Sequence, residues 1–504
     1  MKDTSKYDII IGLEMHIQTK TNSKIFCGCS ANYFQKEPNT LVCPTCLGLP
    51  GGLPRPNRRA IELCILLGLA TNCSIDNEIH FHRKHYSYPD LPKGYQISQY
   101  DRPICYSGYL DVKNEDNNIS RVDIERIHQE EDVAKSTHHK EGSTKYTLID
   151  YNKSGVSLIE LVTRPNIKSA YEAKEFASKI RQILRYLNIS DADMEKGQMR
   201  CEPNISVQEK NRWGYKDGKI LPIGDYKLNP KVEIKNIGSI SAVEKSINYE
   251  VDRLIKEIEE GKQIIQQTRG WDADRGVTIF QRSKESAEDY GYSPDPDIPI
   301  IDISKEDIER ISKELVELPD TKKQRYITQY NLSEYDANVL TSDRDISIYY
   351  ESVLKLVSKQ LDSKTAPKAT ANWLTGSVFS IANENNLEIN EQNIPKEDLA
   401  TLIVEYEDKI LTKNKAEELL RESIIEKKDL GQLLNEAKES AKETTTNLSN
   451  IIEEVINENS KAVEDFKGGK EASLSFLVGQ VMQKTKGTAD PNSARLLLIE
   501  KLNE

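Results

Sequence analysis

Residues 8–18 alternate between apolar and polar side chains with the period of a β-strand. Successive side chains of a strand point to opposite faces, so the apolar ones share a face. These are Ile9, Ile11, Leu13, Met15 and Ile17. The other face carries Glu14 and His16, whose spacing suits one shared metal ion or one shared proton. The alternative, and the commoner meaning of such alternation, is a half-exposed strand whose outer face is simply polar.

Three more segments place acidic side chains on the polar face of a predicted strand, at residues 126–132, 199–207 and 231–236. Neighbouring acids are usually solvated, and a bound cation is the other way to hold them together. If the four polar faces converge, carboxylates with one histidine favour Mg²⁺ or Mn²⁺ over zinc. The predicted ligands are Glu14, His16, Glu202, Glu233 and one of the neighbours Glu130 and Glu131. Positive charge for phosphate oxygens would come from Lys84, Lys93, Arg200 and Lys235.

Helical periodicity and proline content predict the domain organisation. Capping boxes at Ser169–Glu172 and Ser241–Glu244 announce two helices that follow strands in the first part of the chain. Three prolines within residues 292–299 predict a linker, and a polar break near residues 443–446 predicts a second boundary. The fold class is therefore α+β. The first predicted domain, residues 1–294, is built on a mainly antiparallel sheet with flanking helices. The second, residues 295–438, is all-α, and the third, residues 439–504, is a small all-α tail.

Composition limits the class of protein. A chain of 504 residues is too long for one core and should hold about three domains. A net charge of −12 argues against indiscriminate binding of phosphate, although local basic surfaces remain compatible with it. The sequence has no apolar run long enough to cross a bilayer and no signal peptide or presequence. We therefore expect a cytoplasmic protein without membrane contact.

Four of the eight cysteines form two close pairs, Cys27 and Cys29, then Cys43 and Cys46. In a chain without a secretion signal this spacing favours metal ligation over disulfides. Four thiolates leave no open coordination position, so we expect a structural Zn²⁺ site within residues 27–46. The alternative is four free, buried cysteines.

Two other segments have more than one interpretation. Residues 80–100 combine three histidines, three basic residues and several tyrosines, which suits the lining of a channel, RNA binding or, less well, a metal site. Near the C-terminus, lysines in loops are suited either to RNA phosphates or simply to solvent. They are Lys467, Lys470, Lys484 and Lys486.

Several long motifs resemble the B subunits of the aspartyl/glutamyl-tRNA amidotransferases (the GatB family), in the same order and over essentially the whole chain. They lie at residues 11–16, 86–99, 126–132, 199–206, 233–236, 371–373 and 476–480. The resemblance implies a cradle-like catalytic domain, a helical domain and a tail domain similar to the YqeY family.

The resemblance also implies an activity and partners. ATP would phosphorylate the side-chain carboxylate of Glu-tRNA(Gln) or Asp-tRNA(Asn), and ammonia would displace the phosphate to give Gln-tRNA or Asn-tRNA. A glutaminase A subunit would supply the ammonia through an internal channel, and a small C subunit would brace the complex. No amidase signature is present in this chain, which agrees with a glutaminase located elsewhere.

The family's chemistry assigns roles to the predicted residues. Catalysis would involve Glu14, His16, Glu130 and Lys235. ATP would be bound by Lys84, Lys93, Arg200 and Asn204, with Mg²⁺ between the acids. The ammonia channel would be lined by Tyr86, Tyr88, Asp90, Gln96 and Gln99. The C-terminal lysines would contact the mischarged tRNA.

The chain departs from the family pattern around residues 153–166. Lys153 stands where many relatives have arginine, Ser157 replaces a proline, and Arg164 lies where an acid is common. We therefore assign no catalytic role to that loop. The alternatives are a GatE-type subunit specific for Glu-tRNA(Gln), which would carry an inserted domain, and a zinc-bearing tRNA-binding factor without chemistry of its own.

Overall fold

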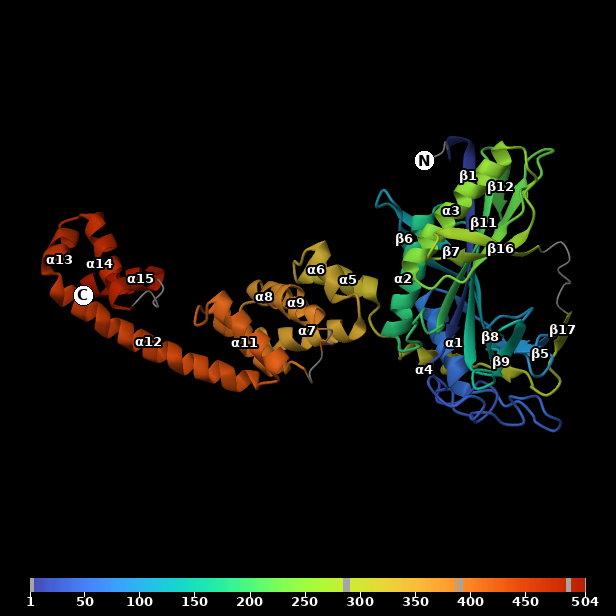
Figure 1. Ribbon diagram of the computed structural model, residues 1–504, viewed down its shortest axis with the longest axis horizontal. Helices are drawn as coiled ribbons and strands as arrows, with labels where there is room; N and C mark the ends of the chain where they lie inside the picture. Colours follow the sequence, from blue (N-terminus) through green and yellow to red (C-terminus); the bar gives the residue numbers. More distant parts are fainter. Residues whose placement is uncertain are drawn as a thin grey trace. The chain divides into compact units, whose positions relative to one another are not determined.

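The computed structural model describes residues 4–283, 291–385, 387, 389, 393–485 and 491–503, with only the backbone described for residues 440–447. It divides the chain into two compact units, Met1–Thr321 and Lys322–Glu504. Sheets dominate the first unit and helices make up the second (Figure 1). This architecture confirms the α+β class predicted from the sequence.

A nine-stranded sheet forms the frame of the first unit, and β1 (Tyr7–Gln18) lies at its centre. All neighbouring strands pair antiparallel except β14 and β15. From one edge to the other the strands are β16 (Val277–Ser283), β15 (Gln267–Asp272), β14 (Val232–Lys235), β11 (Met199–Glu209), β1, β10 (Ser157–Thr163), β7 (Ile119–Glu131), β6 (Cys105–Lys113) and β2 (Ser74–Ile75).

The apolar face of β1 is covered by helices. Ile11, Leu13, Met15 and Ile17 are buried in one core with the inward faces of α1 (Arg58–Ala70), α2 (Ala170–Tyr186) and α3 (Ile240–Glu259). Burying these side chains removes apolar surface from water, which is the main stabilising term for such a layer. The opposite face of the sheet is left for polar groups.

The helix starts agree with the sequence in one case and differ in the other. Ser169 caps α2 by accepting a hydrogen bond from the backbone N–H of Glu172, as the capping box predicts. At α3 the N-cap is Ser239, whose side chain accepts from Ala242, so the prediction of a cap at Ser241 is wrong. Ser239 and Ser241 each lie three residues before a backbone N–H group that their side chain could cap. Only the conformation of the backbone decides which of the two serines is the N-cap.

Smaller sheets extend the first unit. One contains β17 (Gly291–Pro294), β4 (His82–His85) and β5 (Tyr95–Ser98). The others are the pairs β18 (Ile301–Asp302) with β3 (Glu78–Ile79), β12 (Trp213–Lys216) with β13 (Lys219–Pro222), and β8 (Lys135–Glu141) with β9 (Thr144–Asp150).

The proline-rich segment near residue 295 is packed. Asp295 is buried and forms an ion pair with Arg83 at 2.8 Å, and Ile298 is also buried. The first unit continues through α4 (Lys305–Ser312) to Thr321. The domain limits at 294 and 438 remain predictions, but the segment 292–299 is anchored to the first unit because Asp295 is buried and Ile298 belongs to its core.

The second unit holds two hydrophobic cores, and residues of α12 (Leu430–Glu458) contribute to both. α12 is helical through residues 443–446, where the polar break was predicted. The preceding helices are α5 (Pro319–Gln329), α6 (Glu334–Leu340), α7 (Arg344–Val357), α8 (Thr365–Trp373), the π-helix η2 (Leu374–Val378), α9 (Phe379–Glu384), α10 (Lys396–Glu407) and α11 (Lys413–Glu426). After α12 follow α13 (Ser460–Lys467), α14 (Glu471–Lys484) and α15 (Pro491–Asn503).

Within the described ranges, every helix is too short or too polar to span a lipid bilayer.

Candidate active site

Strand register brings imidazole and carboxylate side chains of neighbouring strands together on the polar face of the large sheet. His16 on β1 lies directly opposite Glu160 on β10 and Arg200 on β11. Glu160 in turn lies opposite His128 on β7. Opposed side chains of antiparallel strands have Cβ atoms only about 4.5–5.5 Å apart. Register therefore decides which of these groups can meet.

The centre of the site is the carboxylate–histidine cluster, which consists of Glu14, His16, His128, Glu130 and Glu160. His16 Nε2 lies 3.4 Å from Glu130 Oε1, 3.7 Å from Glu14 Oε1 and 3.8 Å from Glu160 Oε2. His128 Nε2 lies 3.3 Å from Glu160 Oε2. Two sets of possible metal ligands converge here, each with its donor atoms within 4.8 Å of one another. One set is Glu14, His16 and Glu160, and the other is His128, Glu130 and Glu160, so Glu160 is common to both.

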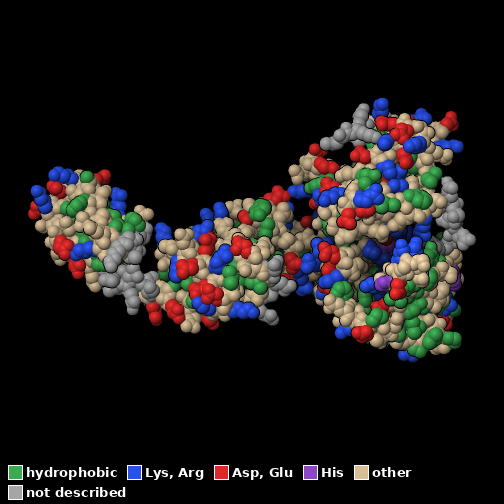
Figure 2. Space-filling model, in the orientation of Figure 1, with side chains coloured by type: hydrophobic (Ala, Val, Ile, Leu, Met, Phe, Trp, Pro, Cys, Tyr) green, Lys and Arg blue, Asp and Glu red, His purple; other side chains and the backbone are tan. Residues whose placement is uncertain are grey.

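The cluster forms one wall of a pocket of 340 Å³. Cations line other parts of it, and they come from several strands: Lys84, Arg126, Lys235 and Arg282. Tyr100 and Tyr292 also line the pocket and stack with ring centroids 4.2 Å apart. Figure 2 shows Lys and Arg side chains gathered around a hollow in the first unit. Acids on one wall and cations on the others can hold a metal ion together with phosphate oxygens.

Burial, and after it the crowding of negative charge, raises the pKa of two carboxyl groups in the cluster. Burial, with the nearby carboxylate of Glu160, raises the pKa of Glu14 to about 7. Burial and the same neighbour raise the pKa of Glu130 to about 8. A divalent cation beside them would favour their charged forms.

The pKa values of Glu160 and His16 are shifted in the opposite direction, downward. Burial by itself would raise the pKa of Glu160, but His128, His16 and Arg126 outweigh it and lower the pKa below its usual range. Burial, assisted by the charge of Arg200, lowers the pKa of His16 to about 4. An ionised carboxylate beside a neutral imidazole matches what metal ligation requires, because bound ligands are deprotonated.

Glu202 and Glu233 lie on the same face of the sheet but are held by a cation of the chain. Lys235 Nζ lies 2.7 Å from Glu202 Oε2 and 3.3 Å from Glu233 Oε1. Asn204 lies opposite Glu233 in the register. In the described part of the chain, neither acid belongs to a convergent set of metal ligands. The predicted ring is therefore divided, and we call this second set the carboxylate–lysine group.

Glu131 and Lys93 bind each other. The Glu131 carboxylate forms an ion pair with Lys93 and accepts a hydrogen bond from the backbone N–H of Ile97 at 2.8 Å. Glu130 and Glu131 are consecutive on β7, so their side chains leave opposite faces, and only Glu130 reaches the cluster. The structure therefore corrects the expectation that Lys93 faces a phosphate and that Glu131 joins the acids.

Arg200 lies beside the cluster and faces another acid. Its Nη2 atom lies 3.6 Å from Asp132 Oδ1. Asp132 is buried, pairs with Lys153 at 2.7 Å and accepts a hydrogen bond from Gln18 at 2.7 Å. Lys153 thus supplies positive charge to a buried carboxylate, the role that an arginine could also fill.

Glu160 and His128 were not predicted as site residues. Glu160 is the one charged residue in the apolar strand 157–163, and its position gave no signal because it has no charged neighbour within that strand. His128 and Glu130 repeat, in reverse order, the carboxylate–histidine spacing of Glu14 and His16. That mirrored spacing was the signal by which the sequence could have identified His128.

One of the predicted channel residues reaches the pocket. Gln99 is buried, lines the pocket and accepts a hydrogen bond from the backbone N–H of Gln129 at 3.0 Å. Tyr86 donates to Gln96 at 2.9 Å, and Gln96 donates to the Glu131 carbonyl at 2.6 Å. The other four lie in the neighbouring segment 86–96: Tyr86, Tyr88, Asp90 and Gln96.

The four predicted zinc ligands meet in space. The sulfur atoms of Cys27, Cys29, Cys43 and Cys46 lie within 4.8 Å of one another. Tetrahedral Zn²⁺ with Zn–S bonds of about 2.3 Å needs sulfurs roughly 3.8 Å apart, which this arrangement can supply. Lys24, fully buried, places Nζ 3.6 Å from Cys46 Sγ. A cation there would stabilise thiolate charge.

The C-terminal lysines are partly engaged with acids. Lys470 pairs with Asp465 at 2.8 Å, and Lys484 lies 3.0 Å from Glu454 and 2.8 Å from Glu458. Lys467 is exposed. Lys486 lies outside the described residues.

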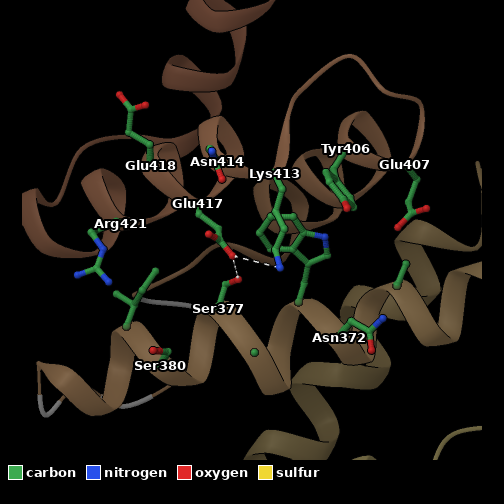
Figure 3. A pocket seen from close by; sticks show the side chains of 14 residues that line it. Asn372, Ser377, Ser380, Tyr406, Glu407, Lys413, Asn414, Glu417, Glu418 and Arg421 are labelled. Atoms are coloured by element: carbon green, nitrogen blue, oxygen red, sulfur yellow. Dashed lines mark hydrogen bonds and ion pairs between the residues drawn. The ribbon is translucent and has the colours of Figure 1, made fainter. Parts of the chain in front are cut away.

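A larger pocket, of 660 Å³, lies in the second unit between the η2 region and α10 and α11 (Figure 3). Glu417 accepts a hydrogen bond from Ser377 at 2.8 Å and lies 3.9 Å from Lys413. Among the described residues, this pocket brings together no set of metal ligands. The convergent chemistry therefore lies in the smaller pocket of the first unit.

Comparisons with known proteins agree with the geometry. Residues 9–309 match the GatB/GatE catalytic domain family, and residues 355–502 match the GatB domain family. The chain is 42% identical to the B subunit of the aspartyl/glutamyl-tRNA(Asn/Gln) amidotransferase of Caldanaerobacter subterraneus, with 99% of this chain and 100% of that protein covered. It is also 42% identical to the corresponding B subunit of Carboxydothermus hydrogenoformans, with 99% of each covered. The chain therefore belongs to the family of aspartyl/glutamyl-tRNA amidotransferase B subunits.

Proposed function

We propose that this chain activates and amidates the side-chain carboxylate of Glu-tRNA(Gln), Asp-tRNA(Asn) or both, in the pocket beside the carboxylate–histidine cluster. ATP would phosphorylate the carboxylate, and ammonia would then displace the phosphate as the amide bond forms. The observation that carries the proposal is the convergence of Glu14, His16 and Glu160 beside a wall of cations. The full-length similarity to B subunits, rather than to the catalytic domain alone, favours this function over a GatE-type subunit.

The cluster is suited to hold Mg²⁺ or Mn²⁺. Oxygen ligands with one or two histidines fit a hard divalent cation. The raised pKa values of Glu14 and Glu130 support this assignment, because burial and the nearby carboxylate of Glu160 disfavour their charged forms and a bound cation would offset both effects. When bound, such an ion neutralises charge on phosphate oxygens.

Basic residues on the pocket wall would orient the ATP phosphates. Burial alone lowers the pKa of Lys84, but the carboxylates of Glu130 and Glu160 outweigh it, so the net shift is upward and Lys84 keeps its charge. Arg126 and Arg282 line the same pocket. Lys84 therefore keeps the phosphate-binding role expected from the sequence, and we assign Arg126 and Arg282 to the role expected of Lys93 and Arg200.

Ammonia would reach the pocket from a glutaminase A subunit, with a small C subunit completing the complex. Gln99 is the residue best placed to receive it, because Gln99 lines the pocket while the segment 86–96 lies next to it in the chain. The acylphosphate needs protection from water, so delivery through protein is physically sensible. Such a complex would work in the cytoplasm, where charged tRNA is used.

The cysteine site would hold a structural Zn²⁺. Four thiolates close the coordination sphere, so the ion would stabilise residues 27–46 and take no part in the reaction. The second unit, with the C-terminal lysines, would contact the body of the tRNA.

The test is an amidation assay with the reconstituted three-subunit complex, glutamine, ATP and each mischarged tRNA. We expect the parent complex to form Gln-tRNA or Asn-tRNA with consumption of ATP. Glu14→Ala should reduce that rate by at least about 100-fold, since it removes a ligand of the activating ion. Equal rates for parent and variant would show that the metal site is wrong. A complex that binds tRNA and never consumes ATP would show a binding module.

A further inference from the structure

The hairpin β8–β9 has no buried face over most of its length. All seven residues of β8 and the first five of β9 are exposed. A lone two-stranded hairpin is only marginally stable in water, so its side chains contribute little to a core of their own. They are available to a partner.

One face of the hairpin carries a flat aromatic surface. His139 lies opposite Tyr146, and their rings stack with centroids 5.4 Å apart and an angle of 14° between planes. Leu148 shares this face because it lies two residues from Tyr146, and 57% of its surface is exposed. Parallel, exposed rings of this kind offer a surface on which a nucleobase can stack.

The other face carries opposed positive charges. Lys140 lies directly opposite Lys145 near the tip. Like charges at this position destabilise a strand pair. In the described part of the chain, neither lysine forms an ion pair with an acid. A bound phosphate would relieve this repulsion, and in a chain of net charge −12 such a pair is a local exception.

The base of the hairpin is tied to the catalytic strands. β7 carries Glu130 into the hairpin and β10 carries Glu160 out of it, so the arm connects two members of the cluster. The C-terminal end of its second strand, β9, is also hydrogen-bonded to the loop of residues 27–46, which carries the four cysteines. The backbone N–H of Asn39 donates to Asp150 Oδ1 at 3.0 Å, and Asn39 Oδ1 accepts from the Tyr151 N–H at 2.7 Å.

We propose that this hairpin is an RNA-binding arm for the single-stranded 3′ end of the mischarged tRNA. A base would stack on His139 and Tyr146 on one face, and the RNA strand would pass over the tip so that its phosphates bind Lys140 and Lys145 on the other face. Lysine is depleted at the centre of protein–protein interfaces, so RNA explains the paired lysines better than another protein does. The inference rests on the proposed function, because only that function brings a tRNA 3′ end to the cluster.

A second hairpin provides a matched control. Lys216 and Lys219 are directly opposed on β12–β13, so this hairpin repeats the charge pattern. It follows β11 and connects no two strands of the cluster, and no parallel ring pair is found on it among the described residues. The double change Lys216→Gln with Lys219→Gln therefore removes the same charge in the same geometry at another place.

The experiment measures KM for mischarged tRNA at several salt concentrations, with the full reconstituted complex. Lys140→Gln with Lys145→Gln should raise KM about tenfold and lessen the slope of log affinity against log salt by about 1.4, for two phosphate contacts. Tyr146→Ala should also raise KM about tenfold, through loss of stacking. The control pair should change neither quantity, and kcat should stay near the parent value in all variants.

Three other results would overturn the inference. An unchanged KM and salt slope in an active complex would show that the arm does not bind RNA. Equal effects of the control pair would show that only overall charge matters. Loss of assembly with the other subunits, seen by gel filtration, would make the hairpin a protein interface. Failure of the proposed function looks different, because the parent complex itself would then form no amide with ATP.

Discussion

Two groups of acids lie on one face of the same sheet and differ in how their charge is balanced. In the carboxylate–lysine group, Lys235 lies within 3.3 Å of both Glu202 and Glu233. In the carboxylate–histidine cluster, Glu14 and Glu130 have pKa values raised to about 7 and 8. In the first group a cation of the chain offsets part of the negative charge directly. In the second, burial and neighbouring carboxylates disfavour the charged forms of Glu14 and Glu130, which a bound cation would restore. That difference, rather than the number of acids, marks the second group as the ligand site.

The strongest test replaces one acid in each group by its amide. Glu160→Gln should lower kcat for amidation by about 10³-fold, equal to roughly 4 kcal/mol, because it removes the ligand common to both convergent sets. Glu202→Gln should lower it by no more than about tenfold, since Lys235 already binds that carboxylate. The measurement is single-turnover amidation. Equal losses in the two variants would mean that both groups serve the reaction alike.

A second test uses pH. Glu14 and Glu130 must lose protons before they bind a cation, so Mg²⁺ affinity should rise on going from pH 6 to pH 8, by about tenfold or more. Calorimetric titration in two buffers of different ionisation enthalpy should detect proton release at pH 7. Binding without proton release would contradict the assignment of these two groups.

The raised pKa values of Glu14 and Glu130 also predict how the stability of the metal-free chain depends on pH. Both carboxyls have a folded-state pKa above the value of about 4.5 expected when unfolded, so the folded state holds protons more tightly. Their contribution is present below pH 4.5 and is lost as the pH rises through 7 and 8. Mg²⁺ should reduce that loss.

The smallest expected effect concerns the carboxylate–lysine group. Lys235→Met leaves Glu202 and Glu233 without their cation and should lower the stability of the first unit by about 1–2 kcal/mol. Lys20→Met is the control, because Lys20 pairs with Asp191 at the same 2.7 Å while both side chains are largely exposed. Its cost should stay below about 0.5 kcal/mol. Urea unfolding of both variants measures the difference, and equal costs would remove the distinction.

Much of the fold could be predicted from residue patterns. The alternation in residues 8–18 identified a strand with one apolar face, and Ile11, Leu13, Met15 and Ile17 are all buried. The capping box at Ser169 identified the start of α2. These features are local, because strand and helix periodicity is present within a dozen residues. The segment 292–299 was misjudged because prolines indicate a turn without indicating what the turn packs against.

Site residues were predictable only where the signal was a local pair. The spacing of Glu14 and His16 identified two members of the cluster. Glu160 could not be found this way, because its partners His16 and His128 come from other strands through register. Glu131 and Lys93 were predicted as site residues from their local sequence, but in the fold they bind each other. Their mutual ion pair depends on how the loop of residues 86–99 returns to β7.

By itself, the sequence determined the family, the α+β class, the four cysteines that could bind a metal and the apolar face around which the first unit folds. The tertiary structure decided which acids share a cation of the chain and which do not. The physical reason is that a carboxylate's charge balance depends on groups within a few ångströms. In a sheet those groups are brought together by the pairing of strands distant in sequence. Here register separated Glu202 from Glu160, although both lie on the same face of the large sheet.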